Sequence, residues 1–350
     1  MSKTAFITGI AGQDGAYLSK LLLEKGYRVV GGERRTSSGS LWRLDALGIG
    51  KDVEVVEFEL AEFTNIYRVV ERHRPDEIYN LAAQSRVATS FEMPTMTGDV
   101  TGLGVCRLLD AIRRVDVGIR FYQASTSEMF GHVSQGFQNE DTRFSPRSPY
   151  GVAKLYGHWI TVNYREAYDM FCCSGMLFNH ESPLRGPEFV SRKLTMGVAG
   201  IARGERDCIE LGNTEAQRDW GFAADYVKAM YLMLQHNKPD DYVVATGESH
   251  SVREFAEACF QHIGMRISWE GSGVNAIGVD QKGVPRVKAD PKYFRPAEVG
   301  CSRGDSNKAR RVLGWSPETD FKGLIALMMN AELKNGPSTQ IGDHPLAQER

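Results

Sequence analysis

Residues 4–30 read TAFITGIAGQDGAYLSKLLLEKGYRVV, and the pattern in this stretch decides the fold class. The short apolar run at residues 4–8 predicts a buried strand. The leucines from Leu18 onward recur at helical spacing, and Gly26 stands where such a helix would end. Residues 27–30 then predict a second strand, so the stretch is interpreted as strand, turn, helix and strand.

Three glycines, Gly9, Gly12 and Gly15, form the turn between the first strand and the helix. Glycine lets the turn tighten and lets backbone N–H groups approach a pyrophosphate at the helix N-terminus. A glycine triplet alone is weak evidence. Between a strand and a helix, with a second strand behind it, the triplet predicts a dinucleotide-binding unit. The spacing G-x-x-G-x-x-G resembles that of extended short-chain dehydrogenases/reductases.

The alternation of strands and helices continues along the chain. Further strands are expected at residues 53–58, 77–81, 119–124, 171–178 and 242–246. Further helices are expected at residues 64–70, 99–112, 150–168, 189–202, 226–235 and 321–334. This alternation predicts an α/β fold, a doubly wound parallel sheet of the Rossmann type with a smaller C-terminal α/β domain. The glycine-rich residues 271–288 are interpreted as a loop.

Two domains are predicted from the order of these elements. Residues 1–178 and about 219–247 are expected to form the nucleotide-binding Rossmann domain. Residues 179–218 and about 248–335 are expected to form a substrate domain. Residues 336–350 are expected to be a poorly ordered tail.

Composition argues against several function classes. The 350 residues are 42% hydrophobic and 25% charged with a net charge of −2, which gives no general attraction to nucleic acid. The eight His show no metal-ligand spacing and the six Cys form no CxxC pair, so no metal site and reduced thiols are expected. No apolar run approaches membrane-spanning length, and the N-terminus enters a strand without a signal segment. We therefore expect a cytoplasmic protein with no membrane or nucleic-acid partner.

Four residues near the middle of the chain carry acid–base groups. Tyr150 and Lys154 are four residues apart, so they share one face of the helix expected there. Thr126 and Glu128 directly follow the strand expected at residues 119–124. Because ligands of such sheets lie beyond the carboxyl ends of the strands, all four groups would meet at one site. Such a set can move protons to and from a carbon that bears a hydroxyl. An isolated Tyr–Lys pair is usually a surface accident, and the nucleotide-binding pattern changes those odds.

Tyr150 needs help to act as a base. A free tyrosine has a pKa near 10, which is too high for a base at neutral pH. One cation at about 4 Å, in an effective dielectric of about 20, contributes roughly 4 kcal/mol, or about 3 pKa units. Lys154 is therefore expected to supply most of the required shift, with desolvation opposing it.

Cofactor choice depends on residues 33–38, ERRTSS, which follow the second strand. An acid such as Glu33 would accept a hydrogen bond from the ribose 2′-OH of NAD, whereas arginines and hydroxyls would hold the 2′-phosphate of NADP. Both kinds of residue are present. Because two guanidiniums outnumber one carboxylate, Arg34, Arg35 and Ser37 favour NADP(H).

With these residues in view, the chain resembles the GDP-mannose 4,6-dehydratase family of extended short-chain dehydrogenases/reductases over roughly residues 3–334. The most specific segments are NHESP from Asn179 and RDWG from Arg218, which separate this family from dTDP-glucose dehydratases and sugar epimerases. The resemblance implies dehydration of GDP-D-mannose to GDP-4-keto-6-deoxy-D-mannose, a lyase reaction in which a hydride moves from C4 to C6 through a retained NADP(H). It also implies a homo-oligomer, a tetramer built as a dimer of dimers.

The resemblance assigns roles residue by residue. The residues matching the catalytic ones are Thr126, Glu128, Tyr150 and Lys154. Those matching cofactor contacts, with the neighbours expected beside them, are Gly9, Gly12, Gln13, Asp14, Gly15, Arg34, Arg35, Ser37, Glu59, Leu60, Leu81, Ala82, Ala83, Ser85, Tyr150, Lys154, His180 and Arg185. Those matching GDP-sugar contacts are Ser85, Thr126, Glu128, Asn179, Lys193, Arg218, Arg295 and Glu298. Three residues depart from the family pattern: Glu33 replaces an apolar residue, Met96 a tyrosine and Glu59 an aspartate.

Three other functions stay open at this point. A related GDP-sugar, such as a GDP-mannoheptose, would suit the same dehydratase. A GDP-4-keto-6-deoxymannose reductase needs Tyr150 and Lys154 but no base for C5, so Glu128 argues against it. A non-catalytic NADP-sensing protein would have little use for the four acid–base residues.

Overall fold

The computed structural model describes residues 2–35, 41–132, 136–294, 297 and 299–334, and the chain divides into two compact units. The first unit comprises Met1–Leu184, Glu215–Ser251 and Arg295–Phe321, and the second comprises Arg185–Thr214, Val252–Phe294 and Lys322–Arg350. These bounds differ from the predicted domains chiefly at residues 295–321, which the sequence pattern places in the second domain and which pack in the first unit. The predicted tail at residues 336–350 lies outside the described residues.

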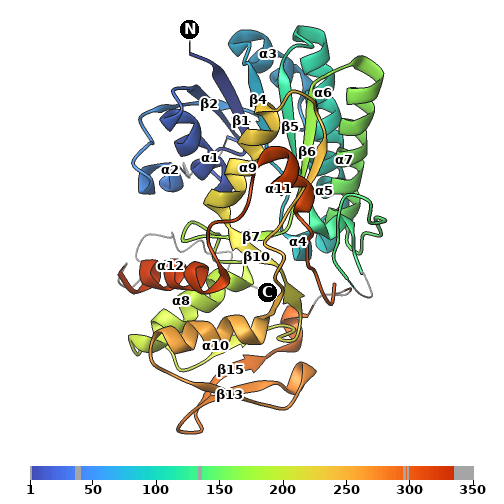
Figure 1. The fold of residues 1–350 in the computed structure, drawn as a ribbon. Coiled ribbons are helices and arrows are strands. Elements are labelled where there is room, and N and C mark those ends of the chain that lie inside the picture. Colours follow the sequence, from blue (N-terminus) through green and yellow to red (C-terminus); the bar gives the residue numbers. More distant parts are fainter. Residues whose placement is uncertain (1, 36–40, 133–135, 295–296, 298, 335–350) are drawn as a thin grey trace. The chain divides into compact units, whose positions relative to one another are not determined.

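The first unit is built on a seven-stranded parallel sheet (Figure 1), which confirms the predicted doubly wound fold. Its strand order is β3-β2-β1-β4-β5-β6-β11. The order reverses between β1 and β4, and sheets of this type bind ligands at such a reversal, beyond the carboxyl ends of the strands. The strand bounds are β1 Thr4–Thr8, β2 Arg28–Glu33, β3 Val53–Glu57, β4 Glu77–Asn80, β5 Arg120–Thr126, β6 Cys172–Leu177 and β11 Asp241–Val244.

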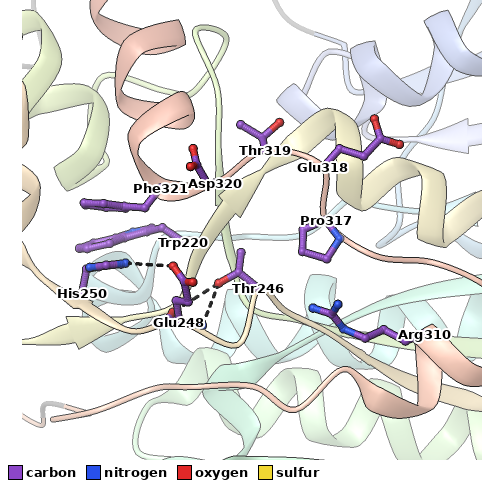
Figure 2. A pocket seen from close by; sticks show the side chains of 10 residues that line it. All are labelled: Trp220, Thr246, Glu248, His250, Arg310, Pro317, Glu318, Thr319, Asp320 and Phe321. Carbon is purple, nitrogen blue, oxygen red and sulfur yellow. Dashed lines mark hydrogen bonds and ion pairs between the residues drawn. The ribbon is translucent and has the colours of Figure 1, made fainter.

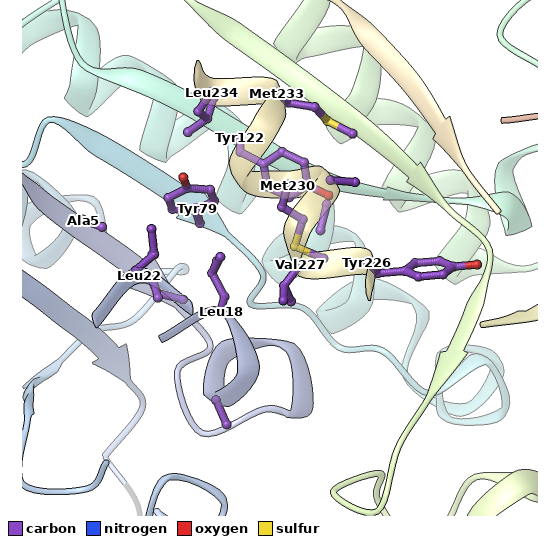
Figure 3. Close-up of a cluster of buried hydrophobic side chains, with 14 of the residues drawn as sticks. Ala5, Leu18, Leu22, Tyr79, Tyr122, Tyr226, Val227, Met230, Met233 and Leu234 are labelled. Carbon is purple, nitrogen blue, oxygen red and sulfur yellow. The ribbon is translucent and has the colours of Figure 1, made fainter. Parts of the chain in front are cut away.

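Helices cover both faces of this sheet, because alternate strand residues point to opposite sides. In β1, Ala5 and Ile7 pack in one apolar cluster while Phe6 packs in another. The first cluster joins the sheet to α1 (Gln13–Glu24) and α9 (Ala223–Gln235), and Figure 3 shows Leu18 and Met230 from these helices near Tyr79 and Tyr122 of the sheet. The second cluster joins the opposite face to α3 (Phe63–His73), α6 (Gly104–Val115) and α7 (Pro149–Tyr168).

The helix predicted at residues 99–112 is part of a longer helical run. It comprises α5 (Pro94–Thr97), a π-helix (Gly98–Leu103) and α6, which follow one another without a break. Short elements complete the first unit: α2 Trp42–Ala46, α4 Val87–Glu92, a 3₁₀ turn Ser127–Met129, β7 Asn179–Glu181, β9 Gln217–Arg218, β10 Trp220–Phe222, β12 His250–Ser251 and α11 Asn307–Leu313. The strand β7 pairs with β10, and β9 pairs with β12.

The second unit contains a four-stranded sheet with helices beside it. The sheet order is β13-β14-β15-β8, with bounds β13 Ile267–Glu270, β14 Ile277–Asp280, β15 Pro285–Ala289 and β8 Ile209–Leu211. Its helices are α8 Val190–Ala202, α10 Val252–His262 and α12 Phe321–Lys334, with 3₁₀ turns at Gly273–Asn275 and Pro291–Tyr293. The prediction that residues 271–288 form a loop is therefore wrong, because this segment contains β14 and most of β15. Gly271, Gly273 and Gly283 lie in the connections between strands, which gives the segment its loop-like composition.

Two features are absent from the described residues. No helix among them is long and apolar enough to cross a membrane. No group of three or more His, Cys, Asp or Glu in that part of the chain is arranged to hold a metal ion.

Candidate active site

The N-terminus of α7 brings Tyr150 and Lys154 to the sheet. Ser148 caps the helix by accepting a hydrogen bond from the Gly151 backbone N–H at 3.0 Å, and Pro149 occupies the first turn. Both Tyr150 and Lys154 are buried. The Lys154 ammonium donates to the Ala124 carbonyl of β5 at 2.6 Å and lies 5.8 Å from the centre of the Tyr150 ring. The predicted pair is therefore part of the folded interior, where its geometry is fixed.

The burial of Lys154 affects its charge. Desolvation lowers the pKa of Lys154 to about 8, while the Asp14 carboxylate acts in the opposite direction. At pH 7 the ammonium form still predominates, so a positive charge remains beside Tyr150. Loss of that charge begins only above neutral pH.

Thr126 and Glu128 meet the start of α7. Thr126 ends β5, and its hydroxyl oxygen accepts a hydrogen bond from the Glu128 backbone N–H at 3.3 Å. A Cβ atom on Gly151 would lie only 2.8 Å from the Glu128 carbonyl oxygen, so glycine permits this close approach between the turn and α7. The structure thus brings together the four residues that the sequence predicts as an acid–base set.

A row of polar side chains holds the ends of the central strands. The Thr8 hydroxyl donates to Asn80 Oδ1 at 2.7 Å, and Asn80 Nδ2 donates to Gln123 Oε1 at 2.8 Å, which links β1, β4 and β5. The Thr8 oxygen also accepts hydrogen bonds from the backbone N–H groups of Leu81 and Ala82, both at 3.0 Å. The backbone at residues 81–83, where a cofactor is predicted, is therefore held in place by β1.

The glycine turn leaves space that only glycine can provide. Gly9 has a φ of +71°, and a Cβ there would lie 2.9 Å from the Ala82 backbone nitrogen. A Cβ on Gly15 would lie 2.5 Å from the Gly9 carbonyl oxygen. The turn packs tightly on itself and on the segment that follows β4, and it leads into the N-terminus of α1. This arrangement fits a dinucleotide, whose pyrophosphate binds at such a helix N-terminus.

Gln13 and Asp14, at the start of α1, are tied to the segment that contains β7. Asp14 Oδ2 lies 2.8 Å from His180 Nε2, and the Nδ1 atom of the same ring lies 2.8 Å from the Phe178 carbonyl oxygen. Gln13 Nε2 donates to the His180 carbonyl oxygen at 3.1 Å, and Gln13 Oε1 accepts from the Ser182 hydroxyl at 2.7 Å. Three predicted cofactor contacts therefore form one connected network.

The end of β2 carries the residues on which the predicted choice of NADP(H) depends. Glu33 is half-buried, and its carboxylate accepts a hydrogen bond from the backbone N–H of Ala11 in the glycine turn. Burial raises the pKa of the Glu33 carboxyl above its usual range, against the opposing effects of this N–H and of Arg34 and Arg43. Arg34 and Arg35 are exposed. Ser37 lies outside the described residues.

Arg43 is a residue that the sequence analysis missed. It lies on α2, and its guanidinium donates to the Ala11 carbonyl oxygen at 2.9 Å and to the Leu184 carbonyl oxygen at 2.7 Å. Both acceptors are backbone atoms far away in sequence. No local sequence pattern around Arg43 predicts these contacts, because the tertiary fold brings Arg43 and its two acceptors together.

The remaining predicted residues are more dispersed. Glu59 accepts a hydrogen bond from the Ala61 backbone N–H, Leu60 is buried beneath Gly104, and Ser85 is exposed after β4. Asn179 lies in β7, opposite Trp220 of β10, and Arg218 donates to the backbone oxygens of Gln217 and Val299 at 2.8 and 2.7 Å. In the second unit, the Arg185 guanidinium lies 3.6 Å from the Phe189 ring centre and the Lys193 ammonium 3.5 Å from that of Tyr293. Arg295 and Glu298 lie outside the described residues.

A pocket of about 230 Å³ in the first unit lies apart from the acid–base set (Figure 2). The His250 ring stacks on Phe321 with 3.8 Å between ring centres, and Glu248 Oε2 lies 3.6 Å from His250 Nε2. The pocket is lined by Trp220, Thr246, Glu248, His250, Arg310, Pro317, Glu318, Thr319, Asp320 and Phe321. None of these is a predicted catalytic or cofactor residue. The candidate active site is therefore the set around Tyr150, not this pocket.

Comparisons with known proteins decide the family. The model of a family described as GDP-mannose 4,6 dehydratase matches residues 6–328. The chain belongs to the GDP-mannose 4,6-dehydratase family. It is 49% identical over 341 residues to a protein of that name from Drosophila melanogaster, covering 95% of this chain and 86% of that protein. It is 48% identical over 339 residues to the Homo sapiens protein (94% and 91% covered) and 47% identical over 352 residues to the Vibrio cholerae protein (95% of each).

Solved structures support the same fold for this member of the GDP-mannose 4,6-dehydratase family. A dTDP-glucose 4,6-dehydratase from Streptomyces venezuelae, solved with NAD bound, matches with a TM-score of 0.80 at 21% identity, covering 95% of this chain and 97% of that one. A UDP-glucose 4-epimerase from Thermotoga maritima matches with a TM-score of 0.79 at 23% identity, covering 95% and 98%. These identities are too low to carry more than the fold.

Proposed function

We propose that the protein removes water from GDP-D-mannose and yields GDP-4-keto-6-deoxy-D-mannose, with the C4 hydrogen passing to C6 through a retained NADP(H). The observation that carries this proposal is the assembly of Thr126, Glu128, Tyr150 and Lys154 at the end of β5, in a chain of the GDP-mannose 4,6-dehydratase family. When bound, the nicotinamide would supply the hydride acceptor and donor that the reaction needs.

Tyr150 is the base for the C4 hydroxyl in this mechanism. Its phenol is delivered by the first turn of α7, and the Lys154 ammonium lies beside it, fixed by the Ala124 carbonyl. The ammonium favours the phenolate because opposite charges attract more strongly in a buried site than in water. Oxidation at C4 makes the neighbouring C5–H acidic, so the next step needs a second base.

Glu128 takes the C5 proton, and Glu128 or Thr126 supplies a proton to the hydroxyl that leaves from C6. The Thr126 oxygen already accepts the Glu128 N–H, so its own hydrogen can be donated to a substrate oxygen. The carboxylate and the hydroxyl come from residues two apart in sequence, at one short turn. The overall reaction therefore uses two bases, Tyr150 for the C4 hydroxyl and Glu128 for the C5 proton.

Among the described residues of the first unit, Arg218 is our candidate for binding the substrate diphosphate. Its guanidinium is buried and oriented by two backbone carbonyls, from Gln217 and Val299, so little side-chain entropy is lost on binding. Asn179, Lys193, Arg295 and Glu298 stay predictions for the same substrate. So do a cytoplasmic location and a homotetramer.

The choice of NADP(H) rests on the surroundings of Glu33. Its carboxylate accepts the Ala11 N–H, which takes up one of its acceptor positions beside the glycine turn. Arg34 and Arg35 are exposed at the same strand end and suit a 2′-phosphate. Titration of cofactor-free protein with both cofactors at one ionic strength should show at least tenfold tighter NADP⁺ binding, about 1.4 kcal/mol. Equal or tighter NAD⁺ binding would show that Glu33 sets the choice.

The activity itself is tested without any added reductant. Protein incubated with GDP-mannose should release a product lighter by one water, with a C4 carbonyl and a C6 methyl group by mass and NMR. Unchanged GDP-mannose, under conditions where GDP-mannoheptose is dehydrated, would move the substrate to that related sugar. A product that appears only with added NADPH would indicate a reductase.

A further inference from the structure

Arg43 joins two segments that both border the predicted cofactor site. Its guanidinium donates from Nη1 to the carbonyl oxygen of Ala11, in the glycine turn, and from Nε to that of Leu184, just after β7. Ala11 and Leu184 are both buried. The Arg43 guanidinium also lies 4.5 Å from the ring centre of Trp42, which restricts it further. Figure 1 shows α2, which carries Arg43, beside α1.

The Ala11 peptide is held from both of its ends. Glu33 accepts its N–H, and Arg43 donates to its C=O. The opposite charges of Glu33 and Arg43 interact across this peptide. A backbone unit bonded to two charged side chains is held more firmly than one bonded to neutral groups, because charge-assisted hydrogen bonds are stronger.

The Leu184 end is anchored independently of Arg43. The Leu184 backbone N–H donates to the Ser182 hydroxyl at 3.0 Å, and that hydroxyl donates to Gln13 at 2.7 Å. Residues 11–13 and 182–184 are thus joined at two places: through Gln13 and Ser182 on one side, and through Arg43 on the other. The Arg43 contact is the one that reaches the Gly9–Gly12 part of the turn.

We propose that Arg43 is a positioning residue for the cofactor, because it fastens the glycine turn to the segment after β7 through the Ala11 and Leu184 carbonyls. This inference rests on the cofactor part of the proposed function, and it assigns Arg43 no contact with the cofactor. Its effect is on the shape of the turn that meets the pyrophosphate. Since NAD⁺ and NADP⁺ share that pyrophosphate, Arg43 serves both equally.

An equal effect on NAD⁺ and NADP⁺ affinity distinguishes a positioning role from two other roles for Arg43. An arginine that touches the 2′-phosphate would matter for NADP⁺ and not for NAD⁺. An arginine that only stabilises the fold would lower the melting temperature of the cofactor-free protein and leave both affinities unchanged. A positioning role predicts weaker binding of both cofactors by the folded protein, in addition to any loss of stability from the two buried carbonyls.

The experiment measures dissociation constants of cofactor-free protein for NADP⁺ and NAD⁺ by calorimetry or fluorescence, together with the melting temperature. Arg43→Met removes both donors and keeps the apolar stem, and it should raise both constants at least tenfold. Arg43→Lys keeps the charge that faces Glu33 but reaches only one carbonyl. It should raise both constants severalfold and leave their ratio within a factor of two of the wild-type ratio.

Arg28→Met is the matched control, because Arg28 is an exposed arginine of β2 that pairs with Glu54 and touches neither carbonyl. Its constants should equal those of the wild type. A change confined to NADP⁺ in Arg43→Lys would make Arg43 a phosphate ligand and overturn the proposal. Unchanged constants for both cofactors in Arg43→Met would overturn it as well. These titrations need no turnover, so their outcome is separate from whether GDP-mannose is the substrate.

Discussion

The Lys154 side chain is buried and held by one hydrogen bond to the Ala124 carbonyl, and this burial opposes its charge. The pKa of Lys154 falls from 10.5 to about 8 on folding. Between these two values this lysine is more protonated in the unfolded chain than in the folded one, so its own contribution to the free energy of unfolding rises with pH in that window. The difference corresponds to about 3 kcal/mol. Below pH 8 this destabilisation is fully present, because the buried Lys154 keeps its positive charge beside Tyr150.

The first prediction concerns that destabilisation. Cofactor-free Lys154→Met should be more stable than the wild type at pH 7.5, and this difference in unfolding free energy should shrink by pH 10, because the variant side chain carries no charge to desolvate. Urea unfolding at pH 7.5 and pH 10 measures the difference at each pH, and the buried thiols and phenols with raised pKa affect both proteins alike. Lys20→Met, a surface lysine on α1, serves as control and should show no such pH-dependent difference. A difference for Lys154→Met that does not change between the two pH values would place the titrating group elsewhere.

The second prediction separates the two bases. Glu128→Gln keeps the shape of the side chain but cannot take a proton, so deuterium from D₂O should no longer enter at C5 while substrate still slowly reduces the cofactor. Tyr150→Phe should instead block the earlier step and lower turnover by at least two orders of magnitude, with substrate binding retained. NMR of recovered sugar and absorbance of the reduced cofactor distinguish the variants. Wild-type labelling of C5 in Glu128→Gln would mean that another residue is the C5 base.

At the scale of elements, the sequence predicts what local periodicity controls and misses what distant contacts control. The predicted strand at residues 4–8 and the helix at 321–334 are confirmed at their exact residues, and the predicted helix at 150–168 begins only one residue earlier. Residues 271–288 are mispredicted because short strands with polar and glycine residues carry little pattern of their own. Gly278, within β14, is required by close packing: a Cβ there would lie 2.9 Å from Ile267 on β13.

The candidate site likewise contains residues that local sequence patterns predict and residues that depend on distant contacts. Tyr150 and Lys154 are predictable because their spacing on one helix is local, and Thr126 and Glu128 because they end a recognisable strand. Arg43 is not predictable, because both of its partners are backbone carbonyls that only the tertiary fold brings near. Glu33 is recognised as important from its position, but the direction of its carboxylate depends on the Ala11 N–H.

The third prediction tests the glycine turn as an element. Gly9 and Gly26 both have positive φ, at +71° and +80°, so alanine at either position pays a conformational strain of about 1–2 kcal/mol. Only at Gly9 does a Cβ also meet backbone, at Ala82, since nothing lies within 4 Å at Gly26. Gly26→Ala should therefore lose some stability and keep its cofactor affinity. Gly9→Ala should lose more stability and bind cofactor at least tenfold more weakly, as titration and urea unfolding would show. Equal cofactor affinities in the two variants would exclude a role for the close approach to Ala82.

At the scale of the whole molecule, the described acid–base set and glycine turn lie within the first unit, although its chain segments are widely separated in sequence. Residues 295–321 return to this unit between two segments of the second unit, and Trp315 of this segment donates to the Asp225 carbonyl of α9 at 2.8 Å. A sequence read in order assigns such a returning segment to the domain that precedes it. The domain boundary was therefore less predictable than the fold, because it depends on where a late segment packs.

The last prediction concerns assembly, for which the exposed face of α7 is the relevant surface. Val152, Tyr156 and Trp159 recur at helical spacing on α7 and are 56%, 42% and 54% exposed, and Leu103 of the adjoining π-helix is 46% exposed. Exposed large apolar side chains grouped on one helix face are typical of a protein–protein contact. A second copy of the same face is the simplest partner, since closed symmetric pairs are the commonest assemblies. We therefore expect the wild type to be a homo-oligomer by light scattering.

Trp159→Glu should shift this assembly toward smaller species, because a charge on this face must be desolvated without a partner. Val117→Glu is the control, since Val117 is equally exposed at 51% but lies in the turn between α6 and β5. Its mass should equal that of the wild type. Circular dichroism and the melting temperature verify that Trp159→Glu is folded. A folded Trp159→Glu with wild-type mass would show that α7 does not form the contact, and a monomeric wild type would remove the homotetramer from the proposal.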